Sequence, residues 1–237
     1  MSNELLILST TAVGIGFFHT ILGPDHYLPF IVLAKARKWS IPKTAFITFL
    51  CGLGHILSSV VLGLIGVALG VAVFKLESIE SFRGDLAGWL LLIFGFTYFI
   101  WGLRRAIYSK EHKHKHIHPG QPEHTHIHSH LNEHFHYHKK EDYKNLTPWV
   151  LFIVFVFGPC EPLIPLLMYP AAKMGMGSVG VIAAVFGAVT ISTMLGVVLL
   201  FSLGLTKWRI RSLEKYSHAL AGFAILFCGI AIKFLGL

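Results

Sequence analysis

The chain has 237 residues, of which 54% are hydrophobic and 14% are charged. Its mean hydropathy of +0.65 excludes an ordinary soluble globular domain, so we expect an all-α integral membrane protein. The formal net charge of +8 comes from basic residues that gather in alternate connections between apolar windows. This distribution is typical of membrane topology, so the charge does not indicate a nucleic-acid partner.

Six windows of the sequence are almost free of acidic and basic residues, three in each half of the chain. Crossing a hydrocarbon core takes about 20 helical residues, so each window is long enough for one span. Asp25, Glu161 and Lys233 are the charged side chains inside them. The windows cover residues 5–34, 44–74, 86–103, 147–172, 174–206 and 216–237. We therefore predict six transmembrane helices.

The distribution of Lys and Arg predicts the orientation of these helices. Sixteen of the 20 fall in the first, third and fifth connections, and four fall on the opposite side. By the positive-inside rule, both termini face outward and the long central loop is cytoplasmic. We expect a multi-pass protein of the cell (inner or plasma) membrane, surrounded by lipid, with its first helix retained rather than cleaved. A homo-oligomer is compatible with this reading.

An internal repeat relates the two halves of the chain. Placing LGPDHYLPF (22–30) over FGPCEPLIP (157–165) aligns Gly23-Pro24 with Gly158-Pro159 at an offset of 135. CGLGHI (51–56) then falls over FGAVTI (186–191), and LAGWLLLIFG (86–95) over LAGFAILFCG (220–229). With three spans in each half, the second half enters the membrane from the opposite side, as in inverted-topology transporters. We predict a first three-helix repeat at 1–108, a cytoplasmic His-rich loop at 109–146 and a second three-helix repeat at 147–237.

The two Gly-Pro pairs predict helix breaks around a cavity, because proline removes a backbone donor and clashes with the preceding turn. A carboxylate at the centre of a membrane helix costs about 2.5–3.5 kcal/mol, so a cation between Asp25 and Glu161 is expected. A thiolate and imidazoles favour a divalent transition-metal ion over Na, K, Mg or Ca. The predicted ligands are Asp25, His26, Cys160 and Glu161, with His19 and His55 nearby.

Alternatives remain for some of these residues. In a straight helix His19 and His26 lie roughly 10 Å apart along the axis, so they share one ion only if the break folds the segment back. His55 alternatively forms a hydrogen bond across a helix interface, and Cys160 alternatively packs as an apolar side chain. The remaining cysteines, Cys51 and Cys228, are expected to be structural, as is His218.

Eleven histidines lie in the central loop between Lys110 and Lys144. Neutral imidazoles at pH 7 are available as ligands, so we predict a flexible segment that captures metal, with a pH-responsive linker as the alternative. The histidines of this predicted metal-capture loop are His112, His114, His116, His118, His124, His126, His128, His130, His134, His136 and His138.

These motifs resemble the nickel/cobalt transporter group, most closely its six-helix members, the nickel/cobalt exporters and urease-associated permeases of the lysine-exporter superfamily. The likeness rests on GFFHTILGPDH (16–26), GLGHI (52–56), the His-rich loop and FGPCEPLIPLL (157–167). It implies that His19, Asp25 and His26 match the metal-selectivity signature of the group, and that His55 matches the histidine of its next helix. In that signature four residues separate the first His from the Asp, whereas five separate them here.

The sequence therefore predicts a transporter of a divalent transition-metal ion, Ni or Co before Zn, rather than an enzyme. Export is favoured over uptake, with proton exchange as the coupling, and the metal is the transported substrate with no organic cofactor. The alternative is a transmembrane thiol–disulfide electron carrier, which shares the superfamily architecture but needs a cysteine in each half, whereas Asp25 faces Cys160. A third possibility is an exporter of a small organic solute or anion.

Overall fold

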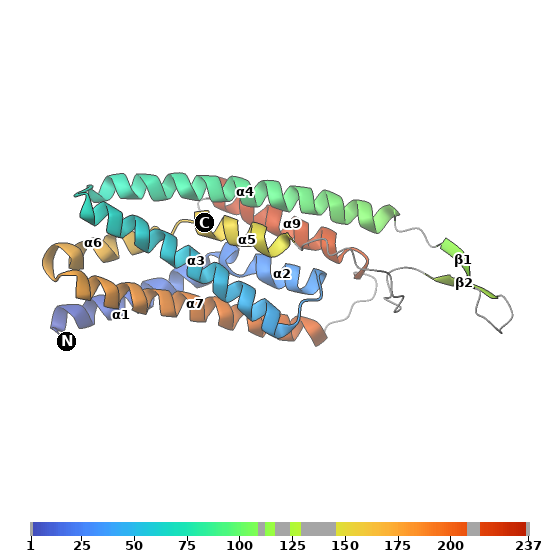
Figure 1. The fold of residues 1–237 in the computed structure, drawn as a ribbon, viewed down its shortest axis with the longest axis horizontal. Coiled ribbons are helices and arrows are strands. Elements are labelled where there is room, and N and C mark those ends of the chain that lie inside the picture. The colour runs from blue at the N-terminus through green and yellow to red at the C-terminus, as the bar shows by residue number, and fades with distance from the viewer. Residues whose placement is uncertain (1, 109–111, 117–123, 129–145, 208–213, 236–237) are drawn as a thin grey trace.

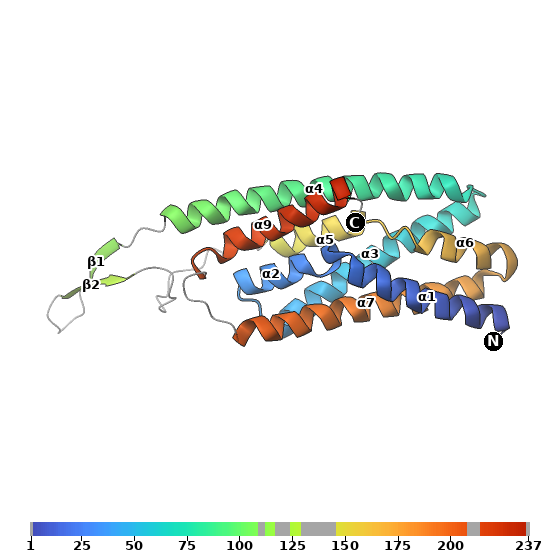
Figure 2. The same ribbon diagram turned by 180° about the vertical axis from the view of Figure 1, so that it is seen from behind.

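The computed structural model describes residues 2–108, 112–116, 124–128, 146–207 and 214–235. Its helices run along one common long axis and form an elongated bundle (Figures 1 and 2). The first part contains α1 (Asn3–Leu22), the 3-10 turn η1 (Pro24–His26), α2 (Leu28–Ala36), α3 (Ile41–Ala68) and α4 (Val73–Tyr108). The second part contains α5 (Thr147–Phe157), α6 (Leu163–Lys173), α7 (Met176–Lys207), α9 (Ser217–Ile230) and the π-helical η2 (Ala231–Leu235).

Within the described residues, five stretches of helix are long and apolar enough to cross a membrane. Large apolar side chains face outward from the bundle: Phe18 is 61% exposed and Leu200 is 70% exposed, which suits contact with lipid rather than water. The prediction of a helical, multi-pass membrane protein is confirmed. The five spans are Asn3–Leu22, Ile41–Ala68, Val73–Tyr108, Met176–Gly204 and Ser217–Phe234.

The fourth predicted window is divided between two short helices. Helices α5 and α6 have 11 residues each, so neither is long enough to span a membrane alone. The first window is divided in the same way, since α1 ends at Leu22 and the nine-residue α2 begins at Leu28. The structure thus has two interrupted segments, one in each half of the sequence.

Helices α4 and α9 pack closely because glycines remove side chains from their contact. A side chain at Gly95 of α4 would overlap the backbone at Leu226, and one at Gly222 of α9 would overlap the backbone at Phe99. Small residues of this kind allow membrane helices to approach at backbone distance. The similar segments LAGWLLLIFG and LAGFAILFCG therefore lie against each other in space.

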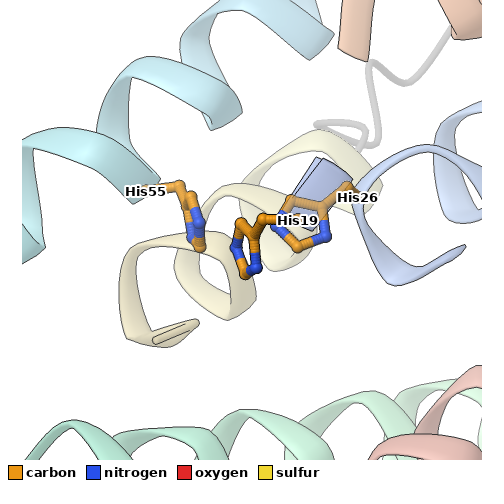
Figure 3. A group of neighbouring side chains, drawn as sticks. All are labelled: His19, His26 and His55. Atoms are coloured by element: carbon orange, nitrogen blue, oxygen red, sulfur yellow. The ribbon is translucent and has the colours of Figure 1, made fainter. Parts of the chain in front are cut away.

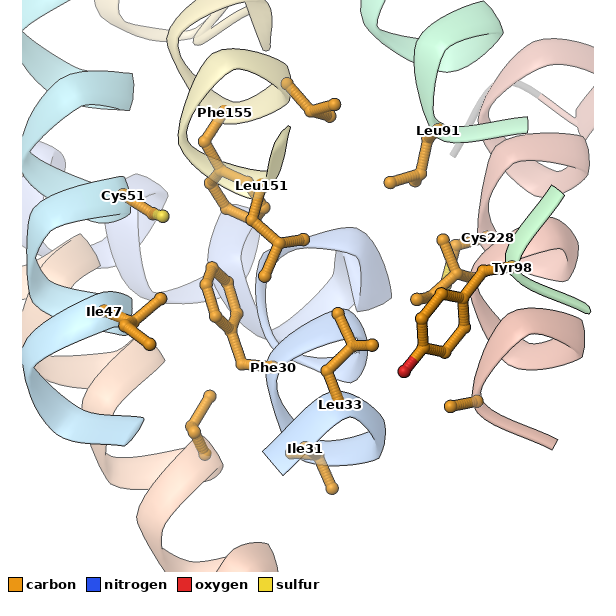
Figure 4. Packing of buried hydrophobic residues seen from close by; sticks show 14 of the residues in the cluster. Phe30, Ile31, Leu33, Ile47, Cys51, Leu91, Tyr98, Leu151, Phe155 and Cys228 are labelled. Atoms are coloured by element: carbon orange, nitrogen blue, oxygen red, sulfur yellow. The ribbon is translucent and has the colours of Figure 1, made fainter. Parts of the chain in front are cut away.

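A buried apolar cluster surrounds the short helices α2 and α5 (Figure 4). Phe30 of α2 contacts Phe155 of α5 with ring centroids 4.8 Å apart. Cys51 and Cys228 belong to this cluster and lie on opposite sides of it in Figure 4. The first break ends where α2 begins, and the second break begins where α5 ends. The cluster packs against both helices and so holds these ends of the two breaks in place.

The central loop contains an antiparallel two-stranded ribbon, β1 (His112–His116) paired with β2 (His124–His128). The register places His112 opposite His128, His114 opposite His126, and His116 opposite His124. The alternation of histidines with period two along these segments is also the pattern of a strand. The other predicted loop histidines, at 118, 130, 134, 136 and 138, lie outside the described residues.

Candidate functional site

The first helix break places His26 next to His19. The Gly23 amide donates to the His19 carbonyl (3.1 Å) as α1 ends, and η1 then turns the chain before α2 begins. A Cβ at Gly23 would lie 2.6 Å from His26 Nδ1 and 2.9 Å from Asp25 Oδ1, so a side chain at this position would displace His26 or Asp25. The segment folds back as a shared site requires: the His19 and His26 rings are 4.7 Å apart between centroids.

Three histidines meet beside this break (Figure 3). His55 reaches the group from α3, with its ring centroid 5.1 Å from that of His26 and 6.5 Å from that of His19. One ligand atom from each of the three lies within 4.8 Å of the others, and they form the one group of this kind found among the described residues. His26 and His55 are buried, and His19 is partly buried.

The nitrogens of this three-histidine group have few partners. His26 Nδ1 lies 3.2 Å from both the Gly23 carbonyl and Asp25 Oδ1, which orients the ring and leaves Nε2 without a partner. Nε2 of His19 and both ring nitrogens of His55 are also buried without a hydrogen-bond partner in the described part of the chain. Such atoms cost about 1–3 kcal/mol each when unsatisfied, so the group is suited to a ligand that accepts nitrogen lone pairs.

The second helix break lies directly against the histidines. Helix α5 ends at Phe157, and a Cβ at Gly158 would lie 3.2 Å from His55 Nδ1. The Leu163 amide donates to the Cys160 carbonyl (2.9 Å) where α6 begins. The two breaks therefore face each other across the bundle with His55 between them.

The predicted set of Asp25, His26, Cys160 and Glu161 is not brought together around one point. Cys160 is fully buried and packs in an apolar cluster with Leu163 and Phe186, whereas Glu161 is exposed and lines the cavity described below. The two adjacent residues therefore have different surroundings, one apolar and one open to the cavity. Of the predicted residues, the described structure groups His19, His26 and His55, with Asp25 behind His26.

A cavity of about 710 Å³ connects the two breaks. Its lining includes all three histidines together with Asp25, Glu161 and Lys233. Lys233 of η2 forms an ion pair with Asp85 of α4 at 2.5 Å, and Asp85 also lines the cavity. The cavity thus combines imidazoles and carboxylates with one paired ammonium group, and it is large enough for a hydrated ion or a small polar molecule.

An ion pair on α4, which the sequence analysis missed, contacts the second break. Glu80 is completely buried and pairs with Arg83, and its Oε2 accepts a hydrogen bond from the Cys160 amide at 3.1 Å. Opposite charges three residues apart on a helix were a usable signal. The same charges are also typical of the end of a membrane segment, so the sequence alone does not single them out.

The residues expected to be structural have ordinary partners or apolar surroundings. His218 Nδ1 lies 2.8 Å from the Tyr98 hydroxyl, which Arg37 Nε also contacts at 3.1 Å. Cys51 and Cys228 are buried in the apolar cluster around α2 and α5. All three cysteines are free thiols in the described structure.

Comparison with known proteins gives one family match. Residues 28–231 match the family described as cytochrome c biogenesis protein transmembrane region. No curated protein and no solved structure matches the chain. The matched region contains the second break and the described helices from α2 to α9. It leaves out α1, η1 and all of η2 after Ala231.

This match contradicts the predicted transport of a divalent metal ion and supports the alternative, a thiol–disulfide electron carrier, better. The prediction is wrong because neither metal-ligating residue types nor a resemblance in short motifs by itself indicates that an ion passes through the protein. The match spans most of the sequence and the second helix break, but not the first break at residues 23–27. The chain belongs to the family of cytochrome c biogenesis protein transmembrane regions.

Proposed function

We propose that this protein is a transmembrane electron carrier that works by thiol–disulfide exchange, with Cys160 as its reactive thiol. The observation that carries the proposal is the position of Cys160 in a helix break of a chain that belongs to a cytochrome c biogenesis family. Cys160 follows Pro159, outside regular helix, whereas Cys51 and Cys228 lie inside α3 and α9.

The local backbone favours Cys160 as the thiol that becomes accessible. Residues 158–162 lie between α5 and α6 and have no continuous ladder of helical hydrogen bonds, so local opening costs less there than inside a long helix. Gly158, Pro159 and Glu161 already line the cavity, although the Cys160 side chain is buried. A rearrangement of this short segment is sufficient to bring the thiol to the cavity.

The first break carries Asp25 where the second carries Cys160, so a cysteine pair across the two breaks, as expected for such a carrier, is missing. Exchange through Cys160 alone therefore requires both partner proteins to carry dithiols. The Cys160 thiolate attacks the disulfide of an acceptor protein, which forms a mixed disulfide and releases one acceptor thiolate. A donor dithiol then attacks Cys160 Sγ, releases the second acceptor thiol and forms a new mixed disulfide. The second donor thiol attacks that bond, which frees Cys160 as a thiol and leaves the donor as a disulfide. Two electrons and two protons pass from donor to acceptor.

Trapping the mixed disulfide tests this role. The probe is a single-cysteine variant of a thioredoxin-type protein whose thiol carries a thionitrobenzoate leaving group. We expect a covalent conjugate with the wild-type chain and with Cys51→Ser and Cys228→Ser, and none with Cys160→Ser. Conjugation through Cys51 or Cys228, or no conjugate at all, would refute the proposal.

We propose further that the chain crosses the membrane six times as an inverted repeat, with α5 and α6 together forming the fourth span. Two interrupted segments, each in one half of the sequence, support this arrangement. The start of α1 and the ribbon lie at opposite ends of the bundle, in keeping with a loop separated from the N-terminus by three spans (Figures 1 and 2). Cysteine accessibility from each side of oriented vesicles tests the predicted outward termini and cytoplasmic loop.

A second proposal follows from the three-histidine group, which we infer to hold a resident transition-metal ion rather than a transported one. Three nitrogen lone pairs and an acid that orients His26 resemble the ligand and supporting shells of protein metal sites. The visible spectrum of added Co(II), measured with the loop histidines replaced by serine, tests it. His55→Ala should abolish the signal and His218→Ala should preserve it; equal signals in both variants would exclude the site.

A further inference from the structure

We propose that Glu80 and Arg83 are positioning residues that hold the second helix break closed over Cys160. This inference rests on the proposed redox role of that thiol. The two side chains occupy one face of α4, three residues apart, and together they contact the chain before the break, the chain after it, and α3.

Arg83 satisfies the end of α5. Its Nη2 donates to the carbonyls of Val156 (2.8 Å) and Gly158 (3.4 Å), and to Ser58 Oγ of α3 (2.6 Å). The last carbonyls of a helix lack partners within the helix, and basic side chains are favourable at this end. The guanidinium group therefore replaces the turn of helix that Pro159 prevents.

Glu80 binds the other side of the break. Its carboxylate accepts hydrogen bonds from the Cys160 amide (3.1 Å) and from Ser59 Oγ (3.3 Å), and it also pairs with Arg83. The side chain is completely buried, so no water replaces these partners when the break is closed. The Cys160 backbone is thus held through its amide by a charged group on another helix.

Close packing of α4 on the break brings the pair into position. A Cβ at Gly84 would lie 2.9 Å from Pro159 Cγ, so α4 contacts the proline with no intervening side chain. Asp85, the next residue, forms its ion pair with Lys233 of η2 instead. Helix α4 therefore carries one carboxylate that binds the break, Glu80, and another that does not, Asp85. Substitution of Asp85 is the matched control for substitution of Glu80.

The alkylation rate of each thiol in native membranes, resolved by mass spectrometry after treatment with a membrane-permeant maleimide, tests the inference. Hydrogen bonds to charged groups are among the stronger ones in proteins, so Glu80→Ala and Arg83→Ala should raise the rate at Cys160 by about tenfold or more. Glu80→Gln keeps an acceptor for the Cys160 amide and should restore most of the protection. Asp85→Ala should leave the rate at Cys160 unchanged.

The alkylation rates at Cys51 and Cys228 distinguish a local opening of the break from a general loosening of the bundle. We expect the rates at Cys51 and Cys228 to stay at wild-type values in every variant. An equal rise at all three thiols would overturn the inference, because the pair would then stabilise the whole bundle rather than the break. An unchanged rate at Cys160 would overturn it as well. Alkylation needs no electron transfer, so failure of the proposed redox function would be recognised separately by the trapping experiment.

Discussion

Replacing His55 with leucine should stabilise the metal-free protein. The side chain is 3% exposed, and neither ring nitrogen has a hydrogen-bond partner among the described residues. Leucine has a similar volume and no polar atom, so the change removes an unsatisfied group that costs about 1–3 kcal/mol. For a chain of this size each 1 kcal/mol shifts Tm by roughly 2–4 °C, so a gain of about 2 kcal/mol predicts a rise of about 4–8 °C.

The measurement is thermal unfolding of the purified protein in detergent after treatment with a chelator. His218→Leu is the matched control, because His218 Nδ1 does have a partner, the Tyr98 hydroxyl at 2.8 Å. Losing that hydrogen bond should lower the stability by about 1 kcal/mol. If His55→Leu lowers Tm as His218→Leu does, the His55 ring is satisfied in the native protein, and the reasoning that makes the three-histidine group a ligand site is wrong.

Two further predictions concern glycines at close contacts. Gly222→Leu should lower Tm in the same unfolding assay by more than Gly196→Leu. A side chain at Gly222 would overlap the backbone of α4, whereas no neighbouring atom lies within 4 Å of a Cβ at Gly196. Equal losses of Tm would contradict the packing described here. Gly23→Ala should weaken Co(II) binding about tenfold or more by displacing His26, as changes beside metal ligands commonly do. Gly14→Ala should leave the affinity for Co(II) unchanged, because no neighbouring atom lies within 4 Å of a Cβ there. Unchanged affinity in Gly23→Ala would show that the turn at Gly23 does not position His26 for metal binding.

The membrane architecture could be predicted well because it depends on composition over long windows. A stretch of about 20 residues with very few charges has few alternatives to a membrane helix, and the described part of the chain contains five helices with such a stretch. The length of α4 was not predicted, since it continues through Lys75, Glu80 and Arg83 before its apolar part begins. The charges of Glu80 and Arg83 are accommodated inside the helix because the two side chains pair with each other and with the neighbouring break.

The details of the site depend on which way each side chain points at a break, and a repeat alignment does not fix this. Placing Asp25 over Cys160 suggested a shared ion site, but Cys160 faces an apolar cluster. His19 and His55 were named as nearby ligands, yet their meeting with His26 depends on the turn at Gly23. The function was harder still to predict, because a helix break with buried histidines, carboxylates and a cysteine is chemically suited both to ion binding and to thiol exchange.

The most direct test of the account is electron transfer across a sealed membrane. Proteoliposomes would contain an oxidised dithiol protein inside and receive a reduced dithiol protein outside, and the thiols that appear inside would be counted by alkylation. The account predicts transfer by the wild-type chain and by Cys51→Ser, and none above the protein-free rate by Cys160→Ser. Transfer by Cys160→Ser at the wild-type rate, or no transfer by the wild-type chain, would contradict it.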